Sequence, residues 1–121
     1  MAEQIILNTD LYDNLLTERK GDYTAKPRIT GTLYNTDIAA RIVAARTEYQ
    51  HGTILNILDM ADSHKVQAIA EGKSVVDGVG QYLVNVQGAF EGEKAQFEPG
   101  KHALGITYTM GKLLRKTLKL V

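Results

Sequence analysis

The sequence predicts an α+β fold in a single domain, and three observations carry that prediction. Residues 35–49 and 53–71 show the three-to-four-residue apolar spacing of amphipathic helices. Residues 75–108 show instead the two-residue alternation of half-buried strands, and a basic amphipathic helix closes the chain. With 121 residues, 44% of them hydrophobic, the chain has the size and composition of one domain with a core.

The first 33 residues are predicted to be an extension of two strands joined by a loop. Residues 3–8 place three apolar side chains between polar flanks, which is typical of a short edge strand. Residues 10–26 are polar, contain a Gly-Asp turn signal and precede a proline, so we expect a loop there. Residues 28–34 carry isoleucine and leucine among threonines, which favours a second strand.

Two helices should follow, each with its own start signal. Asn35 or Thr36 can cap the first helix, and Asp37 in its first turn complements the helix dipole. Thr53 can cap the second and longer helix. Gly72 stands at the position where helices commonly stop, directly after the apolar stripe of that helix.

A β-hairpin is predicted next. Its first strand covers 75–86, in which Gly78 and Gly80 indicate a bulge or a close approach of the backbone to another group. Segment 88–101 is rich in turn residues and holds more acidic side chains than lysines. The returning strand is predicted over 104–108, where apolar residues alternate again.

The last helix opens around residue 111 and runs to the C-terminus, with all its cations on one face. They follow the i, i+3, i+4, i+7 spacing and are Lys112, Arg115, Lys116 and Lys119. Cations spaced in this way can contact several phosphates of a nucleic-acid backbone at once. A solvated face whose cations favour the helix C-terminus explains the pattern equally well. A membrane-surface helix is a third interpretation, less favoured because the leucines of this helix are needed to cover the hairpin.

The net charge of zero excludes a strongly cationic protein but not a cationic face. The 14 basic residues cancel the 14 acidic ones. Their distribution is uneven, because residues 101–121 hold five basic and no acidic residues. We therefore expect weak and salt-sensitive binding to an anionic partner.

Nothing in the sequence indicates catalysis, a cofactor or a metal. The chain has no cysteine, and His51, His64 and His102 lack metal-ligand spacing, so we expect ordinary surface or turn histidines. Neither serine lies in a nucleophile-elbow pattern. Gly78 and Gly80 precede a strand, whereas a dinucleotide-binding loop opens a helix. We expect a protein without enzymatic activity, cofactor or small-molecule substrate.

The sequence also indicates no secretory or membrane segment. The first residues lack the basic patch and apolar run of a signal peptide. No stretch approaches the roughly 20 apolar residues of a membrane helix. Together with the lack of cysteine, this favours a soluble cytoplasmic protein that does not bind membranes.

The order of two helices, a glycine-marked hairpin and a short basic helix resembles the bacterial HU/IHF family of histone-like DNA-binding proteins. The most specific segments are EGKSVVDGVGQYLVNV at 71–86 and ITYTMGKLLRKTL at 106–118. FEGEKAQFEPGKHAL at 90–104 is similar to the longer HU-like domains in which extra strands precede the helix pair. The resemblance implies a single HU-like domain, with 1–33 as an N-terminal extension and 34–121 as the HU-like core.

The resemblance also implies which residues face DNA. Gly80 matches the family's glycine at the hairpin base, where backbone meets phosphate, and Gly111 begins the Gly-Lys that opens the last helix. The cations expected to bind phosphate are Lys101, Lys112, Arg115, Lys116 and Lys119. The family's arginine-rich arm with a wedging proline has no match, because segment 88–101 holds no arginine. We therefore expect backbone binding by the body of the protein instead of bending by intercalation.

The same resemblance implies an intertwined homodimer with a shared helical core. One helix pair and one hairpin leave little core for a monomer, which supports this expectation independently. The expected function is that of a bacterial nucleoid-associated protein that binds double-stranded DNA weakly. The alternative is a structural or protein-interaction module that has kept the HU-like fold and lost DNA binding. The chain is expected to be either a stand-alone HU-like protein or a piece of a longer one.

Overall fold

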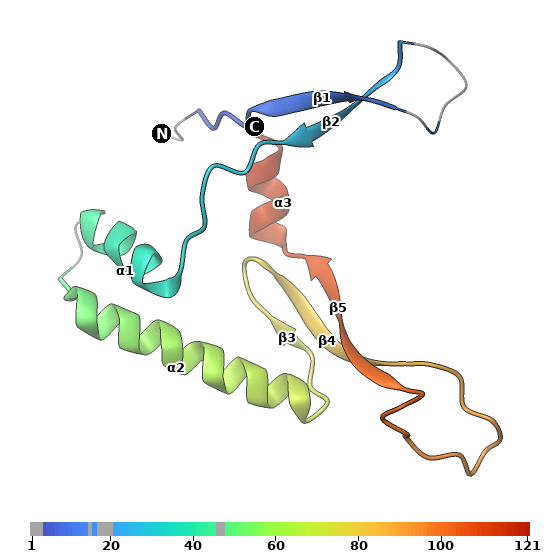
Figure 1. The fold of residues 1–121 in the computed structure, drawn as a ribbon. Helices are drawn as coiled ribbons and strands as arrows, with labels where there is room; N and C mark the ends of the chain where they lie inside the picture. The colour runs from blue at the N-terminus through green and yellow to red at the C-terminus, as the bar shows by residue number, and fades with distance from the viewer. Residues whose placement is uncertain (1–3, 15, 17–20, 46–47) are drawn as a thin grey trace.

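The computed structural model describes residues 4–14, 16, 21–45 and 48–121. Its architecture is α+β, as predicted, with a separate N-terminal hairpin, a helix pair, a second antiparallel sheet and a closing helix (Figure 1). In chain order the elements are β1 (Thr9–Asp13), β2 (Tyr23–Pro27), α1 (Asn35–Ala44), α2 (His51–Ala70), β3 (Val75–Val76), β4 (Gly80–Gln87), β5 (Ala103–Met110) and α3 (Lys112–Leu118).

The N-terminal extension is a hairpin whose strands lie elsewhere than predicted. Strands β1 and β2 fall almost entirely inside residues 10–26, the stretch predicted to be a loop, and Asp13 pairs with Tyr23 at the turn end. Residues 4–8 and 28–34, predicted to be strands, lie outside any strand. The prediction was wrong because it followed runs of apolar residues, whereas this hairpin is held by backbone pairing between strands of largely polar side chains.

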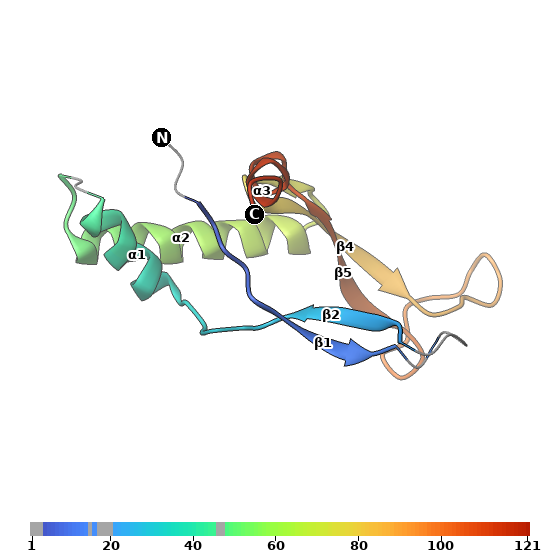
Figure 2. The same ribbon diagram turned by 90° about the horizontal axis from the view of Figure 1, so that it is seen from above.

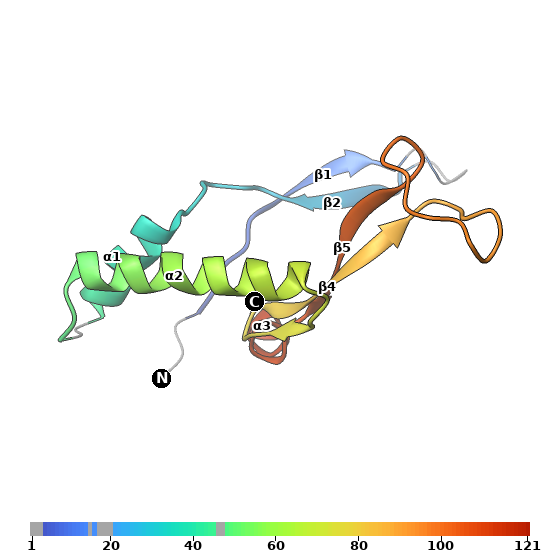
Figure 3. The ribbon, with the colours of Figure 1, turned by 90° about the horizontal axis from the view of Figure 1, so that it is seen from below.

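The hairpin has one polar and one apolar face. On the polar face the Asp10 carboxylate accepts hydrogen bonds from the Arg28 guanidinium, which raises the pKa of Arg28 above its ordinary value. The Lys26 ammonium lies 5.2 Å from the centre of the Tyr12 ring on the same face. Leu11 points to the opposite face and is 67% exposed. Among the described residues, the hairpin makes extensive contact with no other element, and the views from above and below show it apart from the helix pair (Figures 2 and 3).

The two central helices are present, with ends that differ from the prediction. Asp37 lies in the first turn of α1, as predicted, and its carboxylate accepts the Tyr34 N–H at 2.9 Å. The prediction that Asn35 or Thr36 caps this helix was wrong, because the helix already begins at Asn35 and Tyr34 is the N-cap. Helix α1 ends at Ala44 instead of near residue 49. Helix α2 begins at His51, before the cap expected at Thr53. The His51 imidazole donates a hydrogen bond of 2.9 Å to the Thr36 carbonyl, which joins the first turns of the two helices.

The predicted hairpin is a three-stranded antiparallel sheet in the order β3-β4-β5. Its first strand was expected to run over 75–86 with a bulge, but the chain reverses after Val76 and Val75 pairs with Tyr82. The reversal contains the Asp77-Gly78 dipeptide, which is a strong turn signal. The prediction of a bulge did not take this signal into account. Strands β4 and β5 pair along their full lengths, from Gly80 opposite Met110 to Gln87 opposite Ala103.

One face of this sheet is apolar and remains open. The cross-strand pairs on that face are Tyr82–Tyr108, Val84–Ile106 and Val86–Leu104. Together with Val66 and Ile69 of α2, side chains from this face line a groove of about 430 Å³. Among the described residues only Ala39 and Ile54 are apolar and buried. A single chain therefore covers little of the apolar surface that its helices and sheet present.

The sheet places the two ends of β5 in different parts of the molecule. Helix α3 follows one end, close to the β3–β4 turn, and segment 88–102 forms a long loop at the other end (Figure 1). This loop projects away from the helix pair (Figures 2 and 3).

The predicted end of α2 is confirmed, because Gly72 follows the helix with a φ of +92°.

Candidate nucleic-acid interface

The cations predicted from the sequence are concentrated on α3. Lys112, Arg115 and Lys116 lie in the helix and Lys119 is its C-cap, and all four side chains are exposed. None of the four forms an ion pair with another described residue. The helix itself contains no acidic residue. This end of the molecule therefore presents a compact positive surface to solvent. We call these four residues the α3 cations.

The start of α3 is held by the backbone of the β3–β4 turn. Gly111 is the N-cap and has no side chain to accept hydrogen bonds from the first turn of the helix. The Gly78 carbonyl instead accepts the Leu114 N–H at 3.2 Å, and the Val79 carbonyl accepts the Gly111 N–H at 2.9 Å. The Tyr108 hydroxyl also donates to the Val79 carbonyl, at 2.8 Å. The turn thus supplies acceptors that a capping side chain supplies in other helices.

Gly80 and Gly111 allow the backbones of the turn and the helix start to approach closely. Both residues are buried. A Cβ at Gly111 would lie 2.6 Å from the Gly78 carbonyl oxygen, and a Cβ at Gly80 would overlap the Tyr108 ring. The Gly80 N–H, predicted to approach a phosphate, donates a 2.8 Å hydrogen bond to the Asp77 carboxylate. In this structure the two glycines allow the close packing that sets the position of α3.

Asp77 is a residue of this site that the sequence analysis missed. One carboxylate oxygen, Oδ1, accepts the N–H groups of Val79 at 2.9 Å and Gly80 at 2.8 Å. The other, Oδ2, lies 3.0 Å from the Lys65 ammonium on α2. The hydrogen bond from Gly80, followed by that from Lys65, holds the pKa of Asp77 below its usual range. The Asp-Gly dipeptide at 77–78 was the available signal, because it marks a tight turn.

Lys101 does not join the α3 cations. It lies at the opposite end of β5 from α3, which separates the two by about 25 Å at roughly 3.3 Å per strand residue. Its ammonium group lies 3.5 Å from the Glu98 carboxylate, and its side chain is exposed. The structure therefore divides the predicted phosphate-binding residues between two places.

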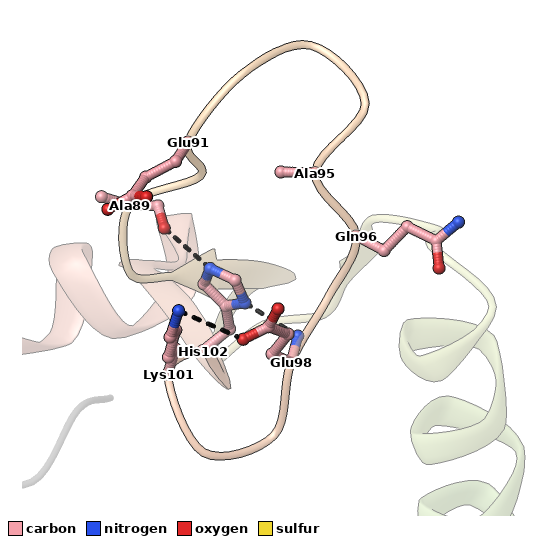
Figure 4. Close-up of a pocket in the computed structure, with 7 residues that line it drawn as sticks. All are labelled: Ala89, Glu91, Ala95, Gln96, Glu98, Lys101 and His102. Atoms are coloured by element: carbon pink, nitrogen blue, oxygen red, sulfur yellow. Dashed lines mark hydrogen bonds and ion pairs between the residues drawn. The ribbon is translucent and has the colours of Figure 1, made fainter.

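His102 closes the loop that contains Lys101 (Figure 4). The imidazole Nδ1 accepts the Glu98 N–H at 2.8 Å, and Nε2 lies 2.8 Å from the Ala89 carbonyl oxygen. Because a carbonyl can only accept, the proton of the ring is on Nε2. His102 was expected to be a surface or turn histidine, but it is only 6% exposed. That prediction was wrong because two aromatic rings cover the imidazole.

The aromatic cover of His102 comes from both sides of the loop. The Phe90 ring stacks on the imidazole with 3.8 Å between ring centres and an angle of 3°. The Phe97 ring is tilted, at 5.7 Å. A small cavity of about 250 Å³ beside the histidine is lined by Glu91, Glu98 and Lys101, among others (Figure 4). The loop is therefore a folded unit with a small core of its own.

The described residues form no cluster of three histidine, cysteine or acidic side chains that could hold a metal ion. His51, His64 and His102 belong to different parts of the fold, namely the start of α2, its middle and the long loop. The acidic side chains of segment 88–101, Glu91, Glu93 and Glu98, are exposed. Among the helices of the described chain, none combines the length and the apolar character needed to cross a membrane.

Comparisons with known proteins agree with the fold and identify a family. The family model of the HU-type DNA-binding domain matches residues 6–121. A search of curated proteins found no match. A crystal structure of a candidate bacterial DNA-binding protein from Bacteroides vulgatus is similar, with a TM-score of 0.78 and 18% identity over 93% of this chain. The chain spans 44% of the length of that protein.

HU from Anabaena, in a crystal with DNA, is also similar. Its TM-score is 0.53 at 18% identity, and the match covers 71% of this chain and 97% of that one. The match therefore includes almost all of the Anabaena chain but leaves part of this chain without a counterpart. At these identities the two solved structures support the fold, whereas the family model supports the relationship.

Proposed function

Because the chain belongs to the HU family of DNA-binding domains, we propose that it binds duplex DNA through the phosphate backbone, without marked sequence preference and without catalysis. The observation that carries the proposal is the set of α3 cations, which are exposed and form no ion pair with another described residue. Contacts of lysine and arginine with phosphates carry no direct sequence information, which fits binding without marked sequence preference. Gly80 and Gly111 serve this surface by setting the position of α3.

The long loop supports a mode of binding that does not wedge the DNA open. Pro99 lies within the tight turn between Glu98 and Lys101, where the Glu98 carbonyl accepts the Lys101 N–H at 2.9 Å. A proline in such a turn is next to strand β5 instead of at an extended tip. Lys101 adds one phosphate contact at most, because Glu98 neutralises part of its charge.

We propose that the DNA-binding unit is a homodimer. The open groove between α2 and the apolar face of the sheet supports this, since few apolar side chains are buried within one chain. Exposed apolar surface of this extent is typical of surfaces that a partner covers. A twofold axis would also present two sets of α3 cations to one DNA molecule, which increases the number of phosphate contacts.

The proposed setting is the bacterial nucleoid, in the cytoplasm. Binding that depends on charge and not on sequence suits a protein that covers DNA at many places. The neutral total of 14 basic and 14 acidic residues supports weak binding that depends strongly on salt. Neither a membrane nor a small-molecule substrate is part of this proposal.

The test is a titration of a fluorescent duplex of about 20 base pairs, followed by anisotropy at about 50 to 200 mM salt. In the test variant Lys112, Arg115, Lys116 and Lys119 are replaced by Ala. We expect its affinity at the lower salt to fall by about a hundredfold. The plot of log affinity against log salt should lose about 0.9 in slope for each phosphate contact removed.

The matched control carries four Ala substitutions elsewhere, at Lys26, Arg28, Arg41 and Lys73, which are exposed and lie outside α3. It changes the net charge equally, and we expect an affinity within about threefold of the wild type, because long-range charge effects are screened. Equal losses in both variants would contradict the proposed surface. If the wild type does not bind DNA at about 50 mM salt, the chain is better described as a protein-interaction module that has kept the fold.

A further inference from the structure

We propose that Asp77 is a positioning residue for the DNA-binding helix: it holds the β3–β4 turn in the shape that fixes the start of α3. Asp77 would not contact DNA itself. Its carboxylate hydrogen-bonds to the backbone of the turn, and the turn hydrogen-bonds to the backbone of the helix. The inference rests on the proposed function, because its main readout is DNA binding by the α3 cations.

Helix α3 depends on neighbouring structure for its stability. It has only seven residues, whereas isolated helices shorter than about 12 residues are marginal in water. Its N-cap is a glycine without a capping side chain, and its first turn holds a lysine and no acidic residue. Both features are unfavourable at the positive end of a helix dipole. The two carbonyl groups of the turn, at Gly78 and Val79, therefore determine where the α3 cations stand.

The shape of the β3–β4 turn depends in part on hydrogen bonds to Asp77. Three hydrogen bonds close the four-residue segment: Oδ1 accepts the N–H groups of Val79 and Gly80, and the Asp77 N–H donates to the Gly80 carbonyl at 2.9 Å. With these bonds made, the carbonyls of residues 78 and 79 are free to accept from α3. Hydrogen bonds to a charged acceptor are stronger than neutral ones, and the Asp77 side chain is only 24% exposed.

The two oxygens of Asp77 have separate partners, and this allows their effects to be separated. Oδ1 serves the turn, whereas Oδ2 lies 3.0 Å from the Lys65 ammonium. Asn at this position keeps an oxygen that can accept from Val79 and Gly80 but removes the charge that attracts Lys65. Ala removes both functions. Comparing Asp77→Asn with Asp77→Ala therefore isolates the hydrogen bonds to the turn.

The change in DNA affinity expected for Asp77→Ala is opposite in direction to the change that its charge alone would produce. Removing an acidic side chain makes the protein more positive, and plain electrostatics then predicts tighter DNA binding. A positioning role predicts weaker binding for Asp77→Ala, because the helix start loses its anchor. The control Asp13→Ala removes an equal charge from the exposed N-terminal hairpin. It is expected to bind as the wild type does or slightly more tightly.

The experiment measures anisotropy of the same duplex with the full chain and its variants. We expect Asp77→Ala to bind the duplex about tenfold more weakly. The slope of log affinity against log salt should fall by the amount that corresponds to the loss of about two phosphate contacts. Asp77→Asn should stay within about threefold of the wild type with an unchanged slope. Weaker binding with an unchanged slope would contradict the positioning role, because a merely destabilised protein lowers the active fraction without changing the slope. Wild-type or tighter binding by Asp77→Ala, with an unchanged slope, would overturn the proposal.

A second measurement uses the wild-type chain and requires neither DNA nor a substitution. The Leu114 amide, which donates to the Gly78 carbonyl, can be followed by NMR in the wild-type chain during acid titration. Because the pKa of Asp77 lies below its usual range, we expect the Leu114 signal to move only at a pH below that at which an ordinary aspartate is protonated, when the turn loosens. An unmoved Leu114 signal would overturn the positioning role. Should the wild type fail to bind DNA, the proposed function fails, while this titration still decides the role of Asp77.

Discussion

A single buried histidine determines the shape of the longest loop in the protein. His102 bonds to the backbone on both sides of the loop, at Glu98 and at Ala89, and lies against the rings of Phe90 and Phe97. These contacts bring together residues that are 13 positions apart in the chain. The loop is thereby closed at its base, and it does not resemble an extended arm that could enter a groove of DNA.

Replacing His102 by Ala should destabilise the protein. Two hydrogen bonds and the aromatic packing are lost, so we expect the free energy of unfolding to fall by about 2 to 3 kcal/mol in urea denaturation. His64→Ala is the matched control, because His64 is exposed on α2 and should change stability by less than about 0.5 kcal/mol. Equal effects of the two substitutions would show that His102 does not hold the loop.

At the scale of elements, the N-terminal hairpin and the body have separate roles in the proposed function. The described cations of the hairpin region are already engaged, with Arg28 on Asp10 and Lys26 over the Tyr12 ring. The α3 cations are not engaged with any described residue in this way. An extended segment, residues 28–34, connects the hairpin to α1 without being part of a strand or helix.

We therefore expect a chain that begins at residue 34 to bind DNA as the whole chain does. Its affinity for the same duplex should stay within about threefold, since the salt-dependent contacts come from α3. The measurement is anisotropy, with circular dichroism to confirm that the helices remain. A loss of more than tenfold in a truncated chain that keeps its helices would assign a DNA contact to the N-terminal extension.

On the scale of the whole molecule, the exposed apolar surface supports the proposed homodimer. The sheet and α2 leave an apolar groove open, lined by residues such as Val84 and Ile106. Ile106 is 54% exposed in the single chain although it lies on the apolar face of the sheet. A second copy that covers this groove would remove apolar area from water, at about 25 cal/mol per Å².

Introducing a charge into the groove should disrupt the proposed dimer. We expect the wild type to sediment at twice the chain mass of 13.3 kDa and Ile106→Glu to sediment as a monomer or to unfold. Thr109→Glu is the matched control, because Thr109 is on the same strand, on the opposite face, and should leave the dimer intact. A wild-type monomer at micromolar concentration, measured by analytical ultracentrifugation, would contradict the homodimer.

Periodicity alone was sufficient for the main elements of the body. The apolar spacing of α1 and α2, the alternation of β4 and β5, and the basic face of α3 are local patterns, and each was found in the structure. The hairpin β1–β2 was missed because its strands carry few apolar residues and are stabilised by pairing with each other. The reversal between β3 and β4 was mistaken for a bulge because both interpretations use the same two glycines.

The sequence by itself determined the α+β class, the family resemblance and the face on which the α3 cations lie, because these depend on residues close together in the chain. Only the tertiary structure decided how that face is held. Asp77 and Gly78 are more than 30 positions from Leu114, and Lys101 proved distant from α3 although it is near in sequence. The physical reason is that hydrogen bonds and close packing join residues across a turn or a strand, and periodicity along the chain carries no information about such contacts.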